Sequence, residues 1–176
     1  MLKSFALIFT TVALAAFSKA ADSVPTDPQI AMIAMIAVVA DSVDIDAGKL
    51  AVEKADDKRV KEFAELMVRD HSAVNAKATA LVKKLGVTPE ESATSKSLKA
   101  DGDKQLAKLK GLKGAEFDKA YVDNEVAYHE AVLGVLDKTL IPNTKNAELK
   151  SLLESARPVF ASHLEHAKMV QTALKK

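Results

Sequence analysis

The amino-acid sequence predicts an all-α fold, a single antiparallel up-down-up-down four-helix bundle with a short extra helix in the connection between the second and third helices. Three observations support this prediction. Apolar residues recur at spacings of three and four along the long segments, which is the helical period. Aromatic residues make up only 5% of the chain and Trp is absent, so the composition favours helices over sheets. The sequence contains no strand-like alternation and no hairpin signal.

Turn and capping residues predict where the helices begin and end. Residues 21–27 form a flexible lead-in, and Asp27 caps a bundle that spans 28–176. Asp56 and Asp57 form the first turn, and Gly86 ends the second helix. Pro158 lies inside the last helix and should bend it. The long helices are expected over 28–55, 57–85, 115–140 and 146–174, with the short helix over 97–109.

Residues 1–20 have the pattern of a secretory signal peptide. A basic start at Lys3 precedes an apolar run over 5–17, and small residues at Ser18 and Ala20 fit cleavage after Ala20. The run is shorter than the ~20 residues that a membrane span needs, which favours cleavage over an uncleaved anchor. The chain has no Cys, which excludes a lipoprotein site, disulfides and thiolate ligands. We expect a periplasmic or secreted protein that is not integral to a membrane after cleavage.

Charge and motifs exclude several functions. The chain carries 25 Lys and Arg against 24 Asp and Glu, and its basic residues form no run with interleaved aromatics. This balance argues against a nucleic-acid partner. The sequence has no Gly-rich phosphate loop, no Cys-based haem or cluster motif and no EF-hand pattern. These absences exclude the corresponding cofactors, and no residue is assigned a catalytic role.

The opening of the first helix, Ile30–Ala40, is apolar on every side. It is too short to span a bilayer, so it should be buried against neighbours or against a partner. Core packing is the interpretation that we favour. The alternative is a surface for a homodimer or for another envelope protein.

Three of the four histidines lie in the middle of an apolar helical stripe. These are His71, His129 and His163, whereas His166 is rotated toward the edge of its stripe. The first helix contributes Asp44, which shares a face with apolar residues. A carboxylate in such a stripe is costly unless it is paired or bound to a metal.

Distances along the helices predict that these side chains meet in one layer. Counted from the turn near Asp56, Asp44 lies about 18 Å away and His71 about 22 Å away. Counted from the turn between the third and fourth helices, His129 lies about 22 Å away and His163 about 28 Å away. In an up-down-up-down bundle both turns lie at the same end, so one carboxylate and three imidazoles should converge.

One carboxylate and three neutral imidazoles make a tetrahedral or open-coordinated site for a metal ion, with Zn²⁺ or Fe²⁺ expected first and Mn²⁺, Ni²⁺ or Cu²⁺ as further options. The predicted ligands are Asp44, His71, His129 and His163. Four neighbouring residues are predicted to orient the ligands by hydrogen bonds, namely Asp70, Asn75, Glu125 and His166. Glu125 shares the inward face with His129 and is also considered as a direct ligand. The alternatives are a metal-free polar layer that fixes helix register and a set of unrelated histidines.

Four stretches match the pattern of a known family in order along the chain. They are Asp44–Ala51, Val60–His71, Phe117–Val122 with His129, and Pro158–Leu164. They resemble the exported bacterial ferritin-like proteins catalogued as a domain of unknown function and often labelled "predicted outer membrane protein". The resemblance implies a ferritin-like bundle, an envelope location that is compatible with outer-membrane association, and no settled activity. Classical di-iron sites use Glu-x-x-His motifs, whereas Glu125 and His129 are four apart, so we do not expect such a site here.

Three functions are compatible with this sequence. The first, which we favour, is an envelope protein that binds a single metal ion for metal homeostasis or stress protection. The second is a metal-free interaction or chaperone-like module with a structural polar layer. The third is a ferritin-like oxidoreductase, for which Glu125, Tyr121 and Tyr128 are the candidate acid–base groups.

Overall fold

The structure, a computed structural model, describes residues 27–175, so the predicted signal peptide and almost all of the lead-in lie outside the described residues. Within 27–175 there are helices and no strand, which confirms the all-α class. None of the helices in this part of the chain is long and apolar enough to cross a membrane. The elements are α1 (Asp27–Lys54), α2 (Lys58–Lys84), α3 (Ala93–Gly111), α4 (Gly114–Val135), the π-helical η1 (Leu136–Leu140), α5 (Ile141–Asn143) and α6 (Ala147–Ala173).

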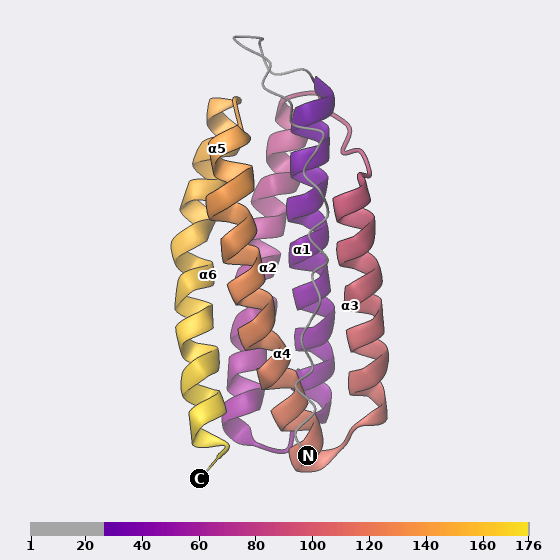
Figure 1. Cartoon of the computed structure of the whole chain (residues 1–176), viewed down its shortest axis with the longest axis vertical. Helices are drawn as coiled ribbons and strands as arrows, with labels where there is room; N and C mark the ends of the chain where they lie inside the picture. Colours follow the sequence, from indigo (N-terminus) through magenta and orange to yellow (C-terminus); the bar gives the residue numbers. More distant parts are fainter. Residues whose placement is uncertain (1–26, 176) are drawn as a thin grey trace.

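The long helices lie side by side along the longest axis of the molecule (Figure 1), and contacts at their ends fix their directions. A backbone N–H of the α1–α2 turn donates to Asp118 near the start of α4 at 2.8 Å. The guanidinium of Arg59, at the start of α2, donates to the carbonyl of Ala173 at the end of α6. At the other end of the molecule Lys84 of α2 pairs with Glu148 of α6. Therefore α2 and α4 run in one direction, and α1 and α6 run in the other.

The predicted up-down-up-down order is not the order found, because the connection between the second and third long helices is itself a long helix. With 19 residues, α3 is longer than the predicted helix over 97–109 and runs along the length of the molecule (Figure 1). This helix packs mainly against α1. A Cβ added at Gly102 of α3 would lie 2.6 Å from a methyl group of Val43 on α1. The α1–α2 and α4–α6 turns consequently lie at opposite ends of the molecule.

Three predicted helix boundaries are confirmed. Asp57 caps α2 by accepting a hydrogen bond from the backbone N–H of Arg59. Gly86 ends the same helix at a φ of 66°, a left-handed conformation that glycine adopts at little cost. Asn146 caps α6 by accepting from the backbone N–H of Leu149 at 2.9 Å.

The predicted third helix does not end at Leu140 but continues to Asn143. Pro142 has no N–H, and its ring would clash with the carbonyl four residues earlier in an α-helix. The chain avoids this clash by widening into η1, where the N–H of Ile141 donates to the carbonyl of Leu136. Pro158 lies inside α6 as expected, and the bend there stays a prediction.

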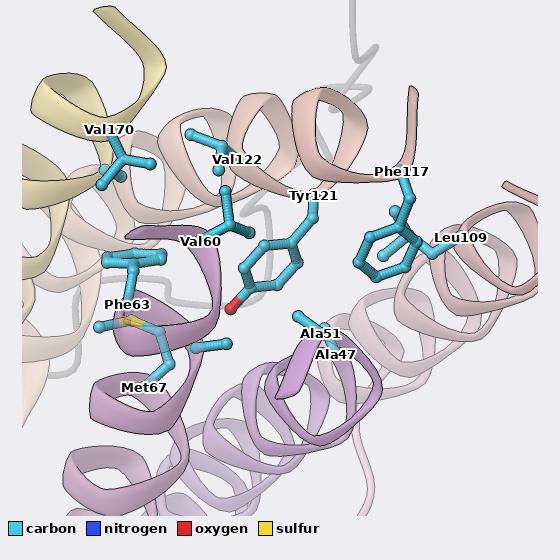
Figure 2. Packing of buried hydrophobic residues seen from close by; sticks show 12 residues of the cluster. Ala47, Ala51, Val60, Phe63, Met67, Leu109, Phe117, Tyr121, Val122 and Val170 are labelled. Atoms are coloured by element: carbon cyan, nitrogen blue, oxygen red, sulfur yellow. The ribbon is translucent and has the colours of Figure 1, made fainter. Parts of the chain in front are cut away.

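Two apolar clusters fill the interior. The proximal cluster, near the α1–α2 turn, packs Phe63, Met67, Phe117 and Tyr121 between α1, α2 and α4 (Figure 2). The distal cluster lies toward the α4–α6 turn and contains Ile30, Ile33, Leu136, Leu140, Leu149, Leu153, Ala156 and Phe160. On each long helix that lines this interior, the residues between the two clusters include buried acids or histidines.

The apolar opening of α1, Ile30–Ala40, is divided between core and surface. Ile30 and Ile33 belong to the distal cluster, as core packing predicts. Residues 35–40 are only half-buried. A role for this segment in binding a second copy or an envelope partner stays a prediction.

Asp118 joins α4 to the α1–α2 turn, since its buried carboxylate accepts from the N–H groups of Asp56 at 3.2 Å and Asp57 at 2.8 Å. We expect Asp118→Ala to lower the free energy of unfolding by about 1.5–3 kcal/mol, because both donors lose a charged acceptor. Urea unfolding followed by circular dichroism measures the change. As a control, Asp101→Ala removes the exposed partner of Lys104 and should change stability by less than about 0.5 kcal/mol. Equal losses in the two variants would contradict this role for Asp118.

Candidate metal centre

A layer of ionisable side chains separates the two apolar clusters. Each of its members is at most 3% exposed. The layer consists of Asp41 and Asp44 from α1, His71 from α2, Glu125 and His129 from α4, and His163 from α6. Every helix that lines the interior therefore contributes at least one polar group at the same level.

The structure brings the predicted ligands together, although its helix order differs from the predicted up-down-up-down order. Each of these residues lies near the middle of its helix, so reversing a helix hardly changes the level of its side chain. His71, for example, is halfway between Lys58 and Lys84, the two ends of α2. The ring centroids of His71, His129 and His163 are 5.2–5.5 Å apart.

Each of these imidazoles has one ring nitrogen within hydrogen-bond distance of a protein oxygen and one nitrogen that makes no hydrogen bond. The pairs are His71 Nδ1 with Asp41 Oδ1 at 2.8 Å, His129 Nδ1 with the carbonyl oxygen of Glu125 at 3.0 Å, and His163 Nε2 with Asp70 Oδ2 at 3.0 Å. The second nitrogen of each ring is buried and has no hydrogen-bond partner. Metal-binding histidines have this arrangement, because a hydrogen bond at one nitrogen orients the lone pair of the other.

Asp44 supplies oxygens to the same space. Its Oδ2 lies 3.2 Å from His71 Nε2 and 3.7 Å from His129 Nε2, and neither of its carboxylate oxygens makes a hydrogen bond. Two ligands bound to one tetrahedral Zn²⁺ at about 2.0–2.1 Å are roughly 3.3 Å apart. The separations around Asp44 are close to that value.

The possible ligand atoms form two overlapping groups. One nitrogen from each of His71, His129 and His163 lies within 4.8 Å of the others. One atom each from Asp44, Glu125 and His129 meets the same limit. His129 belongs to both groups, so the two groups adjoin each other within the layer.

Burial and neighbouring charge set the protonation of the layer. Burial, together with the charge of Asp44, raises the pKa of Glu125 well above its ordinary value, which favours the protonated form of Glu125. Burial lowers the pKa of His129. Burial also lowers the pKa of His71, but the carboxylates of Asp44 and Asp41 outweigh that effect and raise it overall. His129 is therefore neutral near pH 7, the form in which an imidazole binds a metal.

The sequence reasoning missed Asp41. A hydrogen bond of 2.8 Å joins the Asp41 carboxylate to His71 Nδ1. Burial raises the pKa of Asp41. Asp41 stands three residues before Asp44, and this spacing places both acids on one helical face. That spacing within an apolar stretch was the signal available in the sequence.

The four residues predicted to orient the ligands differ in where they lie and what they contact. Asp70 contacts His163 on α6 rather than His71, which it adjoins in sequence. Glu125 lies within the layer, and the side-chain oxygen of Asn75 is buried without a hydrogen-bond partner. His166 packs edge-on against Phe63 in the proximal cluster, so a role in orienting a ligand stays a prediction.

The two tyrosines considered as acid–base groups differ in the hydrogen bonding of their hydroxyl groups. The hydroxyl of Tyr128 donates to the carbonyl of Ala40 at 2.8 Å and thereby joins α4 to α1. The hydroxyl of Tyr121 is buried without a partner (Figure 2). Burial, together with the charges of Glu125 and Asp44, raises the pKa of Tyr121 well above its ordinary value, so this phenol stays protonated.

Comparison with known protein families identifies a match for most of the chain. Residues 14–170 match the family described as "Domain of unknown function (DUF4142)". No curated protein and no solved structure matches the chain.

Protonation of His163 tests the buried arrangement in the metal-free protein. Burial lowers the pKa of His163 to about 4, against the opposing effect of the hydrogen bond to Asp70. NMR titration of the ring carbons should therefore give His163 a lower midpoint than His71. Since the folded pKa lies below the unfolded value of about 6.5, the contribution of His163 to stability is complete above that pH and is lost as the pH falls toward 4. A midpoint for His163 at or above that of His71 would contradict this environment.

Proposed function

The chain belongs to the DUF4142 family, whose description states no activity, and from the geometry of the buried layer we propose that it binds a single divalent metal ion. This membership agrees with the resemblance found in the sequence. The observation that carries the proposal is that three buried imidazoles bring one nitrogen each within 4.8 Å of one another, that each ring has a nitrogen without a hydrogen bond, and that the Asp44 carboxylate lies beside them. The ligands are His71, His129, His163 and Asp44, and Glu125 is available for a fifth position.

The unpartnered atoms support a cation in this layer. Among the described residues, seven such buried side-chain atoms belong to the layer: Asp41 Oδ2, both oxygens of Asp44, His71 Nε2, Glu125 Oε2, His129 Nε2 and His163 Nδ1. Leaving a buried polar atom unsatisfied costs about 1–3 kcal/mol. A divalent ion would accept the lone pairs of several of these atoms at once, and its charge would offset that of the carboxylates.

The donor set favours Zn²⁺ or Fe²⁺. Imidazole nitrogen and carboxylate oxygen suit both ions, and three imidazoles with one carboxylate match the tetrahedral coordination of Zn²⁺. The fold that we propose around the ion is a ferritin-like bundle of α1, α2, α4 and α6. Its site differs from a di-iron centre, because histidines rather than glutamates make up most of the ligands.

The burial of the site supports holding an ion rather than converting a substrate. Every proposed ligand is at most 3% exposed, so a molecule larger than an ion has no direct approach. A catalytic metal needs an open position that the substrate can reach. We propose that the protein acts in metal homeostasis or stress protection in the cell envelope, after removal of residues 1–20.

Metal binding can be measured on the mature chain. Dialysis against Zn²⁺ followed by elemental analysis should give one ion per chain, and an excess of free ion 100-fold above Kd should stabilise the fold by about 2.7 kcal/mol, seen as a higher Tm. His129→Ala should abolish both effects, because it removes a central ligand.

The matched control is Glu130→Ala, which removes the exposed partner of Lys168 next to His129 in sequence and should leave binding intact. The same measurements are made with Fe²⁺ under anaerobic conditions. If neither ion is retained and Tm does not change, the layer is a metal-free structural element and the proposal fails.

A further inference from the structure

One polar side chain connects the buried layer with the surface. Asp70 on α2 has a side chain that is 24% exposed, whereas the members of the layer are at most 3% exposed. Its Oδ2 lies 3.0 Å from His163 Nε2, and its Oδ1 accepts from Nε of Arg69 at 2.7 Å. Arg69 is 71% exposed. A continuous polar path therefore runs from the solvent through Asp70 to His163.

Apolar side chains close the layer along the axis of the molecule. On the proximal side Phe63, Met67 and Tyr121 are fully buried (Figure 2). On the distal side the ring of Phe160 stacks on His71, with centroids 5.0 Å apart and planes inclined by only 9°. An ion that moved along the axis would have to pass through a packed apolar cluster, at a large cost in desolvation.

Two of the lateral seams are closed as well. Between α1 and α2 the backbones are so close that a Cβ at Gly48 would lie 2.9 Å from a methyl group of Val68. Between α1 and α4 the hydrogen bond from Tyr128 to Ala40 joins the helices close to the layer. Asp70 and His163 face each other across the seam between α2 and α6, where the polar path lies.

We propose that the Asp70–His163 pair is the place where the metal ion enters and leaves the buried site, with Arg69 holding the Asp70 carboxylate between these events. This inference rests on the proposed metal-binding function and adds the route to it. The Asp70 oxygen and the His163 nitrogen, 3.0 Å apart, are spaced to bind one divalent cation at about 2.0–2.2 Å from each.

The transfer uses the two nitrogens of one ring. The arriving ion exchanges water ligands for Asp70 Oδ2 and His163 Nε2, and the proton held between these atoms leaves to solvent. Rotation of the His163 side chain would then pass the ion from Nε2 to Nδ1 of the same ring, toward His71 and His129, whose ring centroids lie 5.2 and 5.5 Å from that of His163. There the ion exchanges Asp70 for the buried ligands, and the Asp70 carboxylate returns to Arg69.

The test is stopped-flow loading of the metal-free mature chain with Co²⁺, followed by its visible absorption, with release to a chelator as the reverse measurement. Asp70→Asn keeps a side chain of the same shape but removes its charge, and it should slow loading and release by about tenfold each, with little change in Kd. Arg69→Gln frees the carboxylate and should speed loading. Asp137→Asn is the matched control, because Asp137 makes a similar surface pair with Arg157, and its rates should equal those of the unmodified chain.

Two results would overturn the proposed route. Loading of Asp70→Asn at the unmodified rate would mean that the ion enters elsewhere. Unchanged loading with faster release would mean that Asp70 only orients His163 as a ligand. Equilibrium dialysis against Co²⁺ separates these results from failure of the proposed function, because a chain that retains no Co²⁺ lacks the site as well as the route.

Discussion

The burial of carboxylates and imidazoles between two apolar clusters is the constraint on which the rest of this structure depends. Each such group loses its hydration and needs a partner of opposite charge, a hydrogen bond or a metal ion in return. Asp41 and Asp70 satisfy one nitrogen each of His71 and His163, and the other nitrogen of each ring is buried without a hydrogen bond. Since all four surrounding helices contribute, an ion bound at this level would hold them together, and metal binding would be coupled to folding.

The same constraint relates the fold to the proposed function. The apolar clusters on either side exclude water from the layer, which strengthens electrostatic interactions within it. They also close the approach along the axis of the molecule. A metal ion would therefore reach the layer from the side, at the partly exposed carboxylate of Asp70. A site of this kind is suited to retaining an ion and exchanging it slowly, and its exchange would respond to charge at the surface of α2 and α6.

Much of the fold could be predicted from the sequence because helical period and capping are local properties. Asp57, Gly86 and Asn146 mark helix ends by their own chemistry, and the stripes correctly place His71 and His129 on inward faces. The order of the helices could not be predicted in this way. The helix order depends on the length of α3. Apolar residues recur only weakly at the helical period in this mostly polar segment, so the sequence predicts a short crossing helix. The partner of Asp70 likewise depends on packing between helices, which sequence spacing does not determine.

The central claim is that one ion occupies the layer, bound by side chains from all four helices. Anomalous diffraction at the zinc edge, from crystals grown with Zn²⁺, tests it most directly. We expect a single strong peak within bonding distance of Nε2 of His71 and His129, Nδ1 of His163 and a carboxylate oxygen of Asp44. A map with peaks only at surface residues, and with these nitrogens hydrogen-bonded to one another or to water, would contradict it.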